Sequence, residues 1–170
     1  MRLVIVDDTD KVIGAKDRRE LEPNDIYRVA RLVILNTNGQ LLLAQRAFVK
    51  EKDPGVWGLA VEGTLEEGED YEANIRKEAQ EEIGITPGPL KIGPKLRMTG
   101  KYNHQCQFYI YKAGLDIAKL HLQADELADV KWYEPSTLRQ EVADKPEMFG
   151  YKFSFILETV WPYLGQAESF

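Results

Sequence analysis

Cysteine and histidine are scarce in this chain of 170 residues, which holds one cysteine and two histidines. The single Cys106 excludes an internal disulfide and fits a reducing compartment. One thiol with His104 and His121 is also a poor ligand set for zinc. The sequence therefore predicts a fold that is held together by its hydrophobic core.

Long apolar runs and an excess of positive charge are absent as well. No stretch approaches the length of a membrane span, and the first residues are too few and become acidic too soon, at Asp7, for a signal peptide. A net charge of −6 and a pI near 5.1 argue against nonspecific nucleic-acid binding as the main task. We expect a cytoplasmic protein with no membrane partner and no nucleic-acid partner.

The composition suits one ordinary enzyme domain, predicted to span residues 1–170, because 44% of the residues are hydrophobic and 29% are charged. Apolar residues alternate along the chain between strand and helix spacing. Strands are predicted at 3–6, 12–13, 27–35, 40–45, 57–61, 91–98, 104–111 and 130–133, and helices between 70 and 84 and over 135–142 and 151–164. This order predicts an α/β fold in which a mixed sheet lies between helices on both sides.

The most informative segment of the chain carries three glutamates on one side of its predicted helix. Glu78, Glu81 and Glu82 stand at i, i+3 and i+4, so they share an arc of about 100°. Like charges this close destabilise an isolated helix. A hard divalent cation such as Mg²⁺ or Mn²⁺ reverses that effect, because it accepts carboxylates together with waters and substrate phosphates. The pattern predicts a metal site, and the alternative is a solvated acidic helix face.

The residues around these glutamates predict a loop, helix and loop arrangement. Gly63 and Gly68 permit the backbone angles of a tight loop and a close approach of phosphate or metal. Asp70 or Glu69 can cap the start of the helix, and Gly84 can end it. The stripe that would bury the helix against a sheet consists of Ile75, Ala79 and Ile83.

Residues 63–85 closely resemble the Nudix box, G-x5-E-x7-R-E-U-x-E-E-x-G-U, where U is aliphatic. One position departs from this signature, because Lys77 stands where the family has arginine. The likeness covers most of the chain from about residue 2 to 134, and Leu-Leu-Leu-Ala-Gln-Arg at 41–46 and Pro-Gly-Val-Trp at 54–57 are similar to the branch that includes isopentenyl diphosphate isomerase. The matching box positions are Gly63, Glu69, Glu78, Ala79, Glu81, Glu82, Gly84 and Ile85.

The resemblance implies a Nudix-type α/β/α sandwich and a metal-dependent hydrolase that cleaves a diphosphate linkage in a nucleoside diphosphate or a nucleotide derivative. It assigns Mg²⁺ or Mn²⁺ to Glu78, Glu81 and Glu82, with the backbone carbonyl of Glu62 as a further ligand. Metal binding lowers the pKa of a bound water and offsets charge on the phosphoryl oxygens. Glu78 or a loop acid would accept the proton, and Glu126 resembles the downstream acid of many relatives. Dimers are frequent in the family, so a homodimer is an open expectation.

Lys77 and Glu69 form the second catalytic pair that the resemblance implies. Glu69 stands eight places before Lys77 and should orient it by pairing with its charge. An ammonium group keeps the sign of a guanidinium but loses the planar fork that holds two carboxylates. We therefore expect reduced activity, and more activity in a Lys77→Arg variant.

The candidates for substrate binding are basic and aromatic. Arg46 could contact a substrate phosphate from the end of its strand, although an exposed arginine at a strand end is the simpler explanation. Arg28 and Arg31 project to opposite faces, so at most one points into a cleft, while Gly63 lets a phosphate approach the main chain. Trp57, Phe48, Tyr102 and Phe149 could stack on a nucleobase but are typical of core or rim, and Lys50, Lys52, His104 and Cys106 are interpreted as solvated or structural.

Two other functions are weighed beside hydrolysis. The isomerase keeps a cysteine just before the glycine that opens its box, where this chain has Glu62, and it uses histidines near this region for a second metal site. A Nudix domain of low activity that binds a nucleotide or a partner protein is the stronger alternative. The specificity of such a domain lies in loops, so the sequence leaves the substrate open.

Overall fold

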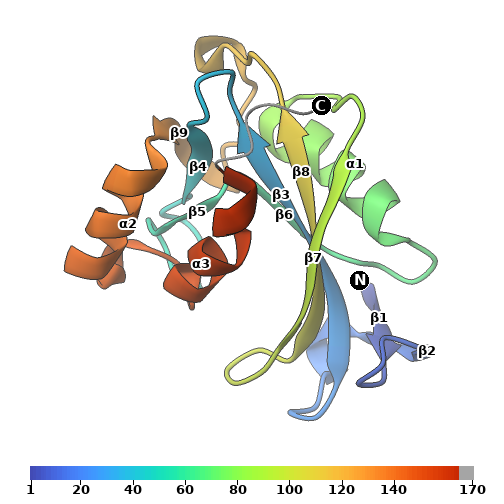
Figure 1. Ribbon diagram of the computed structural model, residues 1–170. Coiled ribbons are helices and arrows are strands. Elements are labelled where there is room, and N and C mark those ends of the chain that lie inside the picture. The colour runs from blue at the N-terminus through green and yellow to red at the C-terminus, as the bar shows by residue number, and fades with distance from the viewer. Residues whose placement is uncertain (165–170) are drawn as a thin grey trace.

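The computed structural model describes residues 1–164, in which strands and helices alternate as the sequence predicts (Figure 1). The fold is of the α/β class, with a mixed and strongly curled sheet. Its strands are β1 (Arg2–Val6), β2 (Val12–Asp17), β3 (Ile26–Leu35), β4 (Leu41–Arg46), β5 (Trp57–Leu59), β6 (Val61–Thr64), β7 (Lys91–Met98), β8 (His104–Lys112) and β9 (Leu127–Tyr133). Its helices are α1 (Tyr71–Ile83), α2 (Pro135–Asp144) and α3 (Phe153–Leu164), with short 3-10 turns at Arg18–Glu20, Ile117–Lys119 and Pro146–Met148.

The sheet is split beside its central strand. β3 pairs in parallel with β8 and in antiparallel with β1 and β6, but it meets β4 only at Leu35 and Leu41, next to their connecting turn. Farther from this turn, β6 pairs with β3 and β5 pairs with β4. Residues 57–64 therefore cross from one half of the sheet to the other, and many of them line the cavity described below.

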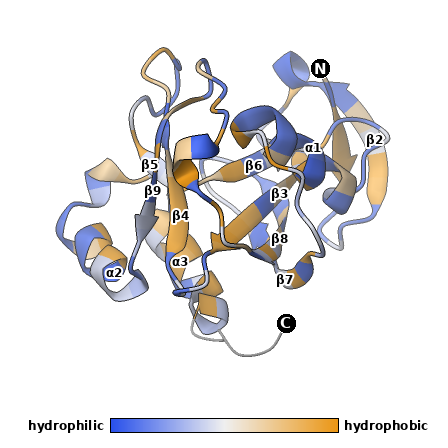
Figure 2. Ribbon diagram, turned by 90° about the horizontal axis from the view of Figure 1, so that it is seen from above, coloured by the Kyte–Doolittle hydropathy of each residue, from blue (hydrophilic) through white to orange (hydrophobic). Residues whose placement is uncertain are grey.

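Helices cover both faces of the sheet, and each face has its own hydrophobic core. One core packs β3, β4 and β8 against α2 and α3, and the other packs β1, β3, β4 and β6 against α1. Figure 2 shows the hydrophobic residues gathered on the central strands, while α1 and α2 also carry hydrophilic residues. Within residues 1–164, no helix is long and apolar enough to cross a membrane.

The ends and the buried side of α1 follow the prediction. Asp70 caps the helix, since its carboxylate accepts the backbone N–H of Ala73 at 2.8 Å, and Gly84 ends it with a φ of +72°. The predicted stripe is fully buried between the helix and the sheet. This packing directs the adjoining side of α1, which carries the glutamates, toward the open part of the sheet. The buried stripe is Ile75, Ala79 and Ile83.

Gly63 differs from the prediction, because it lies inside β6 and not in a loop. The positive φ that a tight turn needs is found at Gly68, at +91°. A side chain at Gly63 would instead collide with α1, since a Cβ there would lie 2.3 Å from Asn74 Oδ1 and 2.4 Å from Glu78 Cγ. Glycine is therefore required for the close packing of helix on strand. The single strand predicted over 57–61 is instead two strands, β5 and β6, and the second extends to Thr64.

Candidate active site

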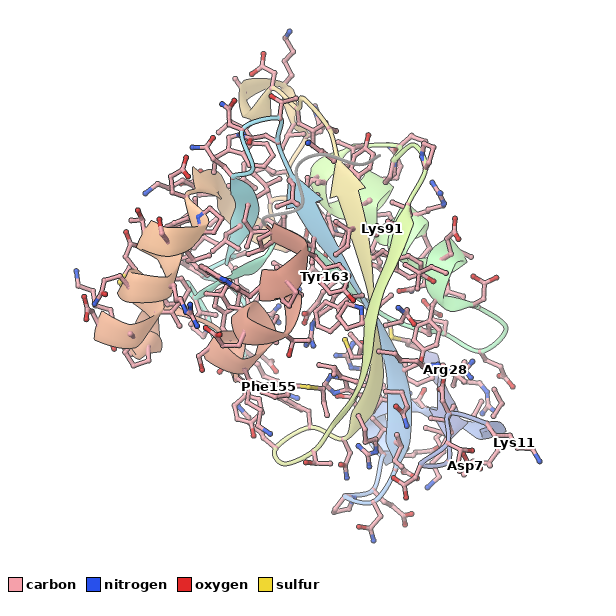
Figure 3. The ribbon with its side chains drawn as sticks, in the orientation of Figure 1. Asp7, Lys11, Arg28, Lys91, Phe155 and Tyr163 are labelled. Atoms are coloured by element: carbon pink, nitrogen blue, oxygen red, sulfur yellow. The ribbon has the colours of Figure 1, made fainter. Side chains whose placement is uncertain are left out.

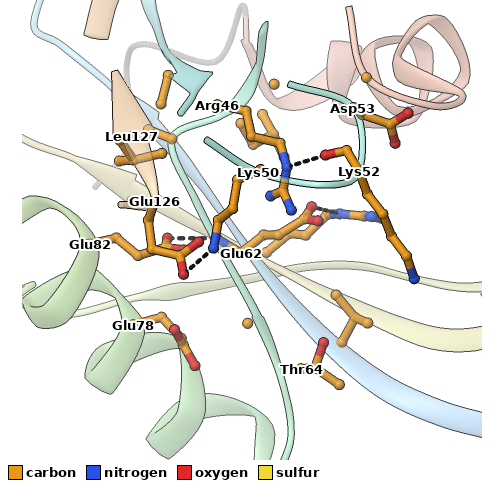
Figure 4. A pocket seen from close by; sticks show the side chains of 18 of the residues that line it. Arg46, Lys50, Lys52, Asp53, Glu62, Thr64, Glu78, Glu82, Glu126 and Leu127 are labelled. Atoms are coloured by element: carbon orange, nitrogen blue, oxygen red, sulfur yellow. Dashed lines mark hydrogen bonds and ion pairs between the residues drawn. The ribbon is translucent and has the colours of Figure 1, made fainter. Parts of the chain in front are cut away.

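A cavity of about 500 Å³ opens at the split in the sheet. Its walls come from β3, from the crossing segment 57–64, from α1 and from the start of α3. Its rim comes from the loops after β4 and β7 and from the loop before β9. In Figure 4, Glu78 and Glu82 of α1 lie on the same side of this cavity as Glu126, with Glu62 beside them. The cavity therefore unites the predicted metal ligands with the predicted substrate-binding arginines.

The acidic wall is the most unusual electrostatic feature of the cavity. Burial raises the pKa of the Glu82 carboxyl well above its usual range, and the negative charges of Glu78, Glu62 and Glu126 raise it further. Within the part of the chain that the structure describes, one hydrogen bond opposes this rise, from the backbone N–H of Glu62 to Glu82 Oε2 at 3.2 Å. Among residues 1–164, no lysine or arginine forms an ion pair with Glu82. The remaining acids that line this wall are Glu66 and Glu81.

Asn74, one turn earlier on α1, restrains the side chain of Glu78 by a hydrogen bond. Partial burial raises the pKa of Glu78, and Glu81 and Glu69 add to the rise, although Lys77 opposes it. Asn74 donates a hydrogen bond from Nδ2 to Glu78 Oε1 at 3.3 Å and another to Glu69 Oε2 at 2.9 Å. Asn74 is fully buried, so it connects the two carboxylates and restrains both.

Lys77 and Glu69 are paired, as the resemblance implies. Lys77 Nζ lies 2.7 Å from Glu69 Oε1 but 3.8 Å from Glu78 and 3.7 Å from Glu66. Partial burial would raise the pKa of Glu69, but hydrogen bonds from Lys77, from the Glu66 backbone and from Asn74, together with the charge of Lys77, outweigh it and the pKa is lowered. One ammonium group thus makes a single close contact, where a planar guanidinium could bind two carboxylates.

Arg31 reaches the cavity and Arg28 does not, as the alternation of β3 predicts. Arg28 pairs with Asp10 near the turn between β1 and β2, a turn that also carries the labelled Asp7 (Figure 3). Arg31 is only 7% exposed, and its Nε donates to Glu62 Oε2 at 2.6 Å while Nη1 contacts Cys106 Sγ at 3.3 Å. Desolvation at the cavity wall would raise the pKa of Glu62, but the charge of Arg31, its hydrogen bond to Glu62 and the charge of Arg46 are among the effects that together outweigh it, and the pKa is lowered.

The rim of the cavity carries three further basic residues. Arg46 lines it, and its Nε donates to the backbone oxygen of Lys52 at 2.7 Å. Lys50 forms a close ion pair with Glu126 (Figure 4), so this lysine is not simply solvated. Glu126 is therefore neutralised by the loop after β4. The loop after β4 also binds the backbone of Glu126, because the Ala47 N–H donates to the Glu126 carbonyl oxygen at 2.8 Å.

The donor chemistry of the acidic wall fits a divalent cation. Burial and mutual repulsion raise the pKa values of Glu78 and Glu82, so a hard cation that takes oxygen ligands would stabilise their charged forms. The side chains of residues 1–164 do not by themselves gather three acidic, histidine or cysteine groups into a ligand set. Glu78, Glu81, Glu82 and the backbone of Glu62 are the residues that would hold the ion.

The predicted aromatic candidates have separate positions. Trp57 and Tyr102 line the cavity, whereas Phe149 is buried and stacks on Phe153. Phe48 is exposed, with its ring beside Gly55. The sequence interpretation missed Asn74 and Lys50 as members of the site. The spacing of Asn74, four residues before Glu78 and five after Glu69, is the signal that could have identified it.

Comparison with known proteins identifies the class to which this fold and site belong. Residues 26–151 match the family model of the NUDIX domain, and the chain belongs to the Nudix family. It is 30% identical over 142 residues to an uncharacterized Nudix hydrolase of Pseudomonas aeruginosa, with 83% of each chain covered. It is 27% identical over 165 residues to an isopentenyl-diphosphate Delta-isomerase of Nocardia farcinica, with 93% of each covered. The fold is similar to a crystal structure of a Deinococcus radiodurans protein, with a TM-score of 0.80, 21% identity, and 93% of this chain and 98% of the other covered.

Proposed function

We propose that this Nudix protein is a hydrolase that uses Mg²⁺ or Mn²⁺ to cleave a diphosphate linkage in a nucleoside diphosphate or a related nucleotide derivative. The observation that carries the proposal is the acidic wall beside two arginines in one cavity, because its Glu82 has no ion-pair partner among residues 1–164 and a strongly raised pKa. A wall of carboxylates repels a phosphate, so these two groups of residues suit one ligand only when a cation lies between them. Buried acids without a counterion would otherwise only destabilise the protein.

In this proposal, the acidic residues of the cavity would bind the cation and accept the proton. Glu78, Glu81 and Glu82 would hold the cation, and Asn74 would restrain Glu78. When bound, the cation would supply a water of lowered pKa and neutralise charge on the phosphoryl oxygens. Glu126 is suited to accept a proton once Lys50 releases it, because a free carboxylate at the cavity rim can act as a general base.

The basic residues would bind and orient the diphosphate. Arg31 has its Nε and Nη1 engaged by Glu62 and Cys106, which fixes its guanidinium plane at the cavity wall. Arg46 is similarly tied to the backbone at Lys52, so both arginines are positioned before a substrate binds. Such positioning lowers the entropy that must be lost to reach the reactive arrangement.

A nucleotide-binding domain without turnover is the second candidate. Lys77 in the family's arginine position favours it, because its one close contact leaves Glu78 less firmly held. Isomerisation is less well supported. Cys106 is fully buried, and burial raises the pKa of its thiol to about 11, so it is a poor acid or base at neutral pH.

A hydrolysis assay with a panel of nucleoside diphosphates and their derivatives, supplied with Mg²⁺ or Mn²⁺, tests this proposal. We expect at least one substrate to be cleaved and Glu82→Gln to abolish the reaction. Glu72→Gln is the matched control, since Glu72 lies on the same helix but pairs with Arg76 outside the cavity. Full activity of Glu82→Gln would overturn the proposal. Tight binding without cleavage would favour the second candidate, and double-bond migration in isopentenyl diphosphate would favour the isomerase.

A further inference from the structure

The cavity has a second end, away from the acidic wall, whose chemistry the hydrolytic site does not use. We call it the aromatic chamber. It lies on the face of the sheet that packs against α3, where β3 and β8 pair through Tyr27 and His104. Its side chains are largely apolar or aromatic. They are Tyr27, Met98, Tyr102, His104, Phe153 and Ile156.

His104 is the exceptional residue of this chamber. Its side chain lines the cavity and is 5% exposed, and neither Nδ1 nor Nε2 has a hydrogen-bond partner among the described residues. Burial, followed by the positive charge of Arg31, lowers its pKa to about 4. At neutral pH the ring is therefore uncharged and offers one donor and one acceptor. A buried polar group without a partner is costly, so this histidine destabilises the empty protein.

The Arg31 side chain extends toward His104. Its Nη1 contacts Cys106 Sγ at 3.3 Å, and Cys106 lies two residues from His104 on β8. Two residues span about 7 Å along a strand, at roughly 3.3 Å per residue. A phosphate held at Arg31 would therefore place the group attached to it near His104. An isopentenyl chain carries nothing that could hydrogen-bond to the imidazole.

We propose that the aromatic chamber holds the organic group of the diphosphate substrate, and that His104 selects a polar heterocycle such as a nucleobase there in preference to an alkenyl chain. This inference rests on the proposed function for its diphosphate, but it concerns binding and not cleavage. The Tyr27 ring lies 5.5 Å from the His104 ring and is only partly buried. Because neither imidazole nitrogen is exposed to solvent, a neighbouring ring must turn aside when the ligand enters, and Tyr27 is positioned to do so.

Binding of nucleoside 5′-monophosphates by isothermal titration calorimetry tests the proposal without requiring turnover. These probes contain no diphosphate bond, so the measurement is made with Mg²⁺ present whether or not the protein is a hydrolase. We expect at least one to bind the wild-type protein more tightly than isopentenyl phosphate. His104→Leu should weaken that binding about tenfold, which corresponds to one lost hydrogen bond. His104→Gln keeps a donor and an acceptor and should retain more of the affinity.

His121→Leu is the matched control, because His121 is exposed and lies outside the cavity; it should bind like the wild type. Thermal unfolding of the empty proteins separates recognition from structure. His104→Leu should unfold at the same or a higher temperature, since it removes an unpartnered buried group, whereas a histidine needed for packing would lower that temperature. The proposal fails if no monophosphate binds, if His104→Leu binds as well as the wild type, or if isopentenyl phosphate binds best. Binding of a monophosphate without hydrolysis of any diphosphate would refute the proposed function but would still support ligand binding in the aromatic chamber.

Discussion

Replacing Glu82 by glutamine should make the metal-free protein more stable and at the same time insensitive to magnesium. Glu82 has a pKa well above the ordinary carboxyl value of 4.5, chiefly because it is desolvated and then because Glu78 repels it. A raised pKa in the folded state means that the folded protein binds the extra proton, so the stability of the metal-free protein falls as the pH rises above about 4.5. Glutamine is a neutral isostere whose amide oxygen can still accept the N–H of Glu62.

The size of the effect follows from the linkage between proton binding and folding. The gain in unfolding free energy at pH 7 is about 1.4 kcal/mol for each pKa unit by which folding raises Glu82. For a domain of this size, each kcal/mol corresponds to roughly 2–4 °C in the unfolding temperature. The gain should disappear near pH 4, where the carboxyl is protonated in the wild type as well.

The assay is thermal unfolding of wild type, Glu82→Gln and Glu72→Gln, each with EDTA and with Mg²⁺. We expect Mg²⁺ to raise the unfolding temperature of the wild type and of Glu72→Gln, because a ligand that binds only the folded state stabilises it. The Glu82→Gln variant should have a higher unfolding temperature than the wild type in EDTA, and Mg²⁺ should raise that temperature little. A lower unfolding temperature for metal-free Glu82→Gln, or a magnesium response equal to that of the wild type, would refute the argument from the uncompensated charge.

Three further predictions concern other parts of the site. Lys77→Arg should raise kcat/KM about fivefold, equivalent to ~1 kcal/mol, by adding a second carboxylate contact; a drop in the measured rate would show that the site has adapted to lysine. Gly63→Ala should lose about 1–3 kcal/mol of unfolding free energy and most of its activity, because the new Cβ would displace Asn74 and Glu78; unchanged urea denaturation and kinetics would contradict this. His104 changes from an ordinary pKa of 6.5 to about 4 on folding, so the unfolded state binds the proton first and the folded protein loses stability as the pH falls from 6.5 to 4. Over this range the wild type should lose roughly 3 kcal/mol more than His104→Leu in urea denaturation, and parallel pH curves for the two would disprove it.

Local sequence features predicted much of this molecule. The order of the strands and helices followed from the spacing of apolar residues, and both ends of α1 followed from Asp70 and Gly84. The pairing of Lys77 with Glu69 could also be expected, since the resemblance supplied it. These features depend on residues close together in the chain or on one helix.

Contacts between distant segments could not be predicted in this way. Lys50 meets Glu126 across 76 positions, and Arg31 meets Cys106 across 75. Such partners depend on strand register and on the split between β3 and β4, which no local pattern encodes. Gly63 was assigned to a loop because glycine often permits unusual backbone angles, whereas its actual importance is the space that α1 occupies.

The cavity at the crossing segment 57–64 is built from two kinds of element, packed strands and helices on one side and loops on the other. The acidic residues of the cavity stand mainly on β6, on α1 and on a loop that is held by Lys50, whereas Tyr102 and Tyr151 line the cavity from loops at its rim. Rim loops tolerate insertion and exchange far better than packed elements do. Chemistry and selectivity are therefore modular here, so that an evolving or engineered descendant can acquire a different substrate by remodelling its entrance while its hydrolytic machinery stays as it is.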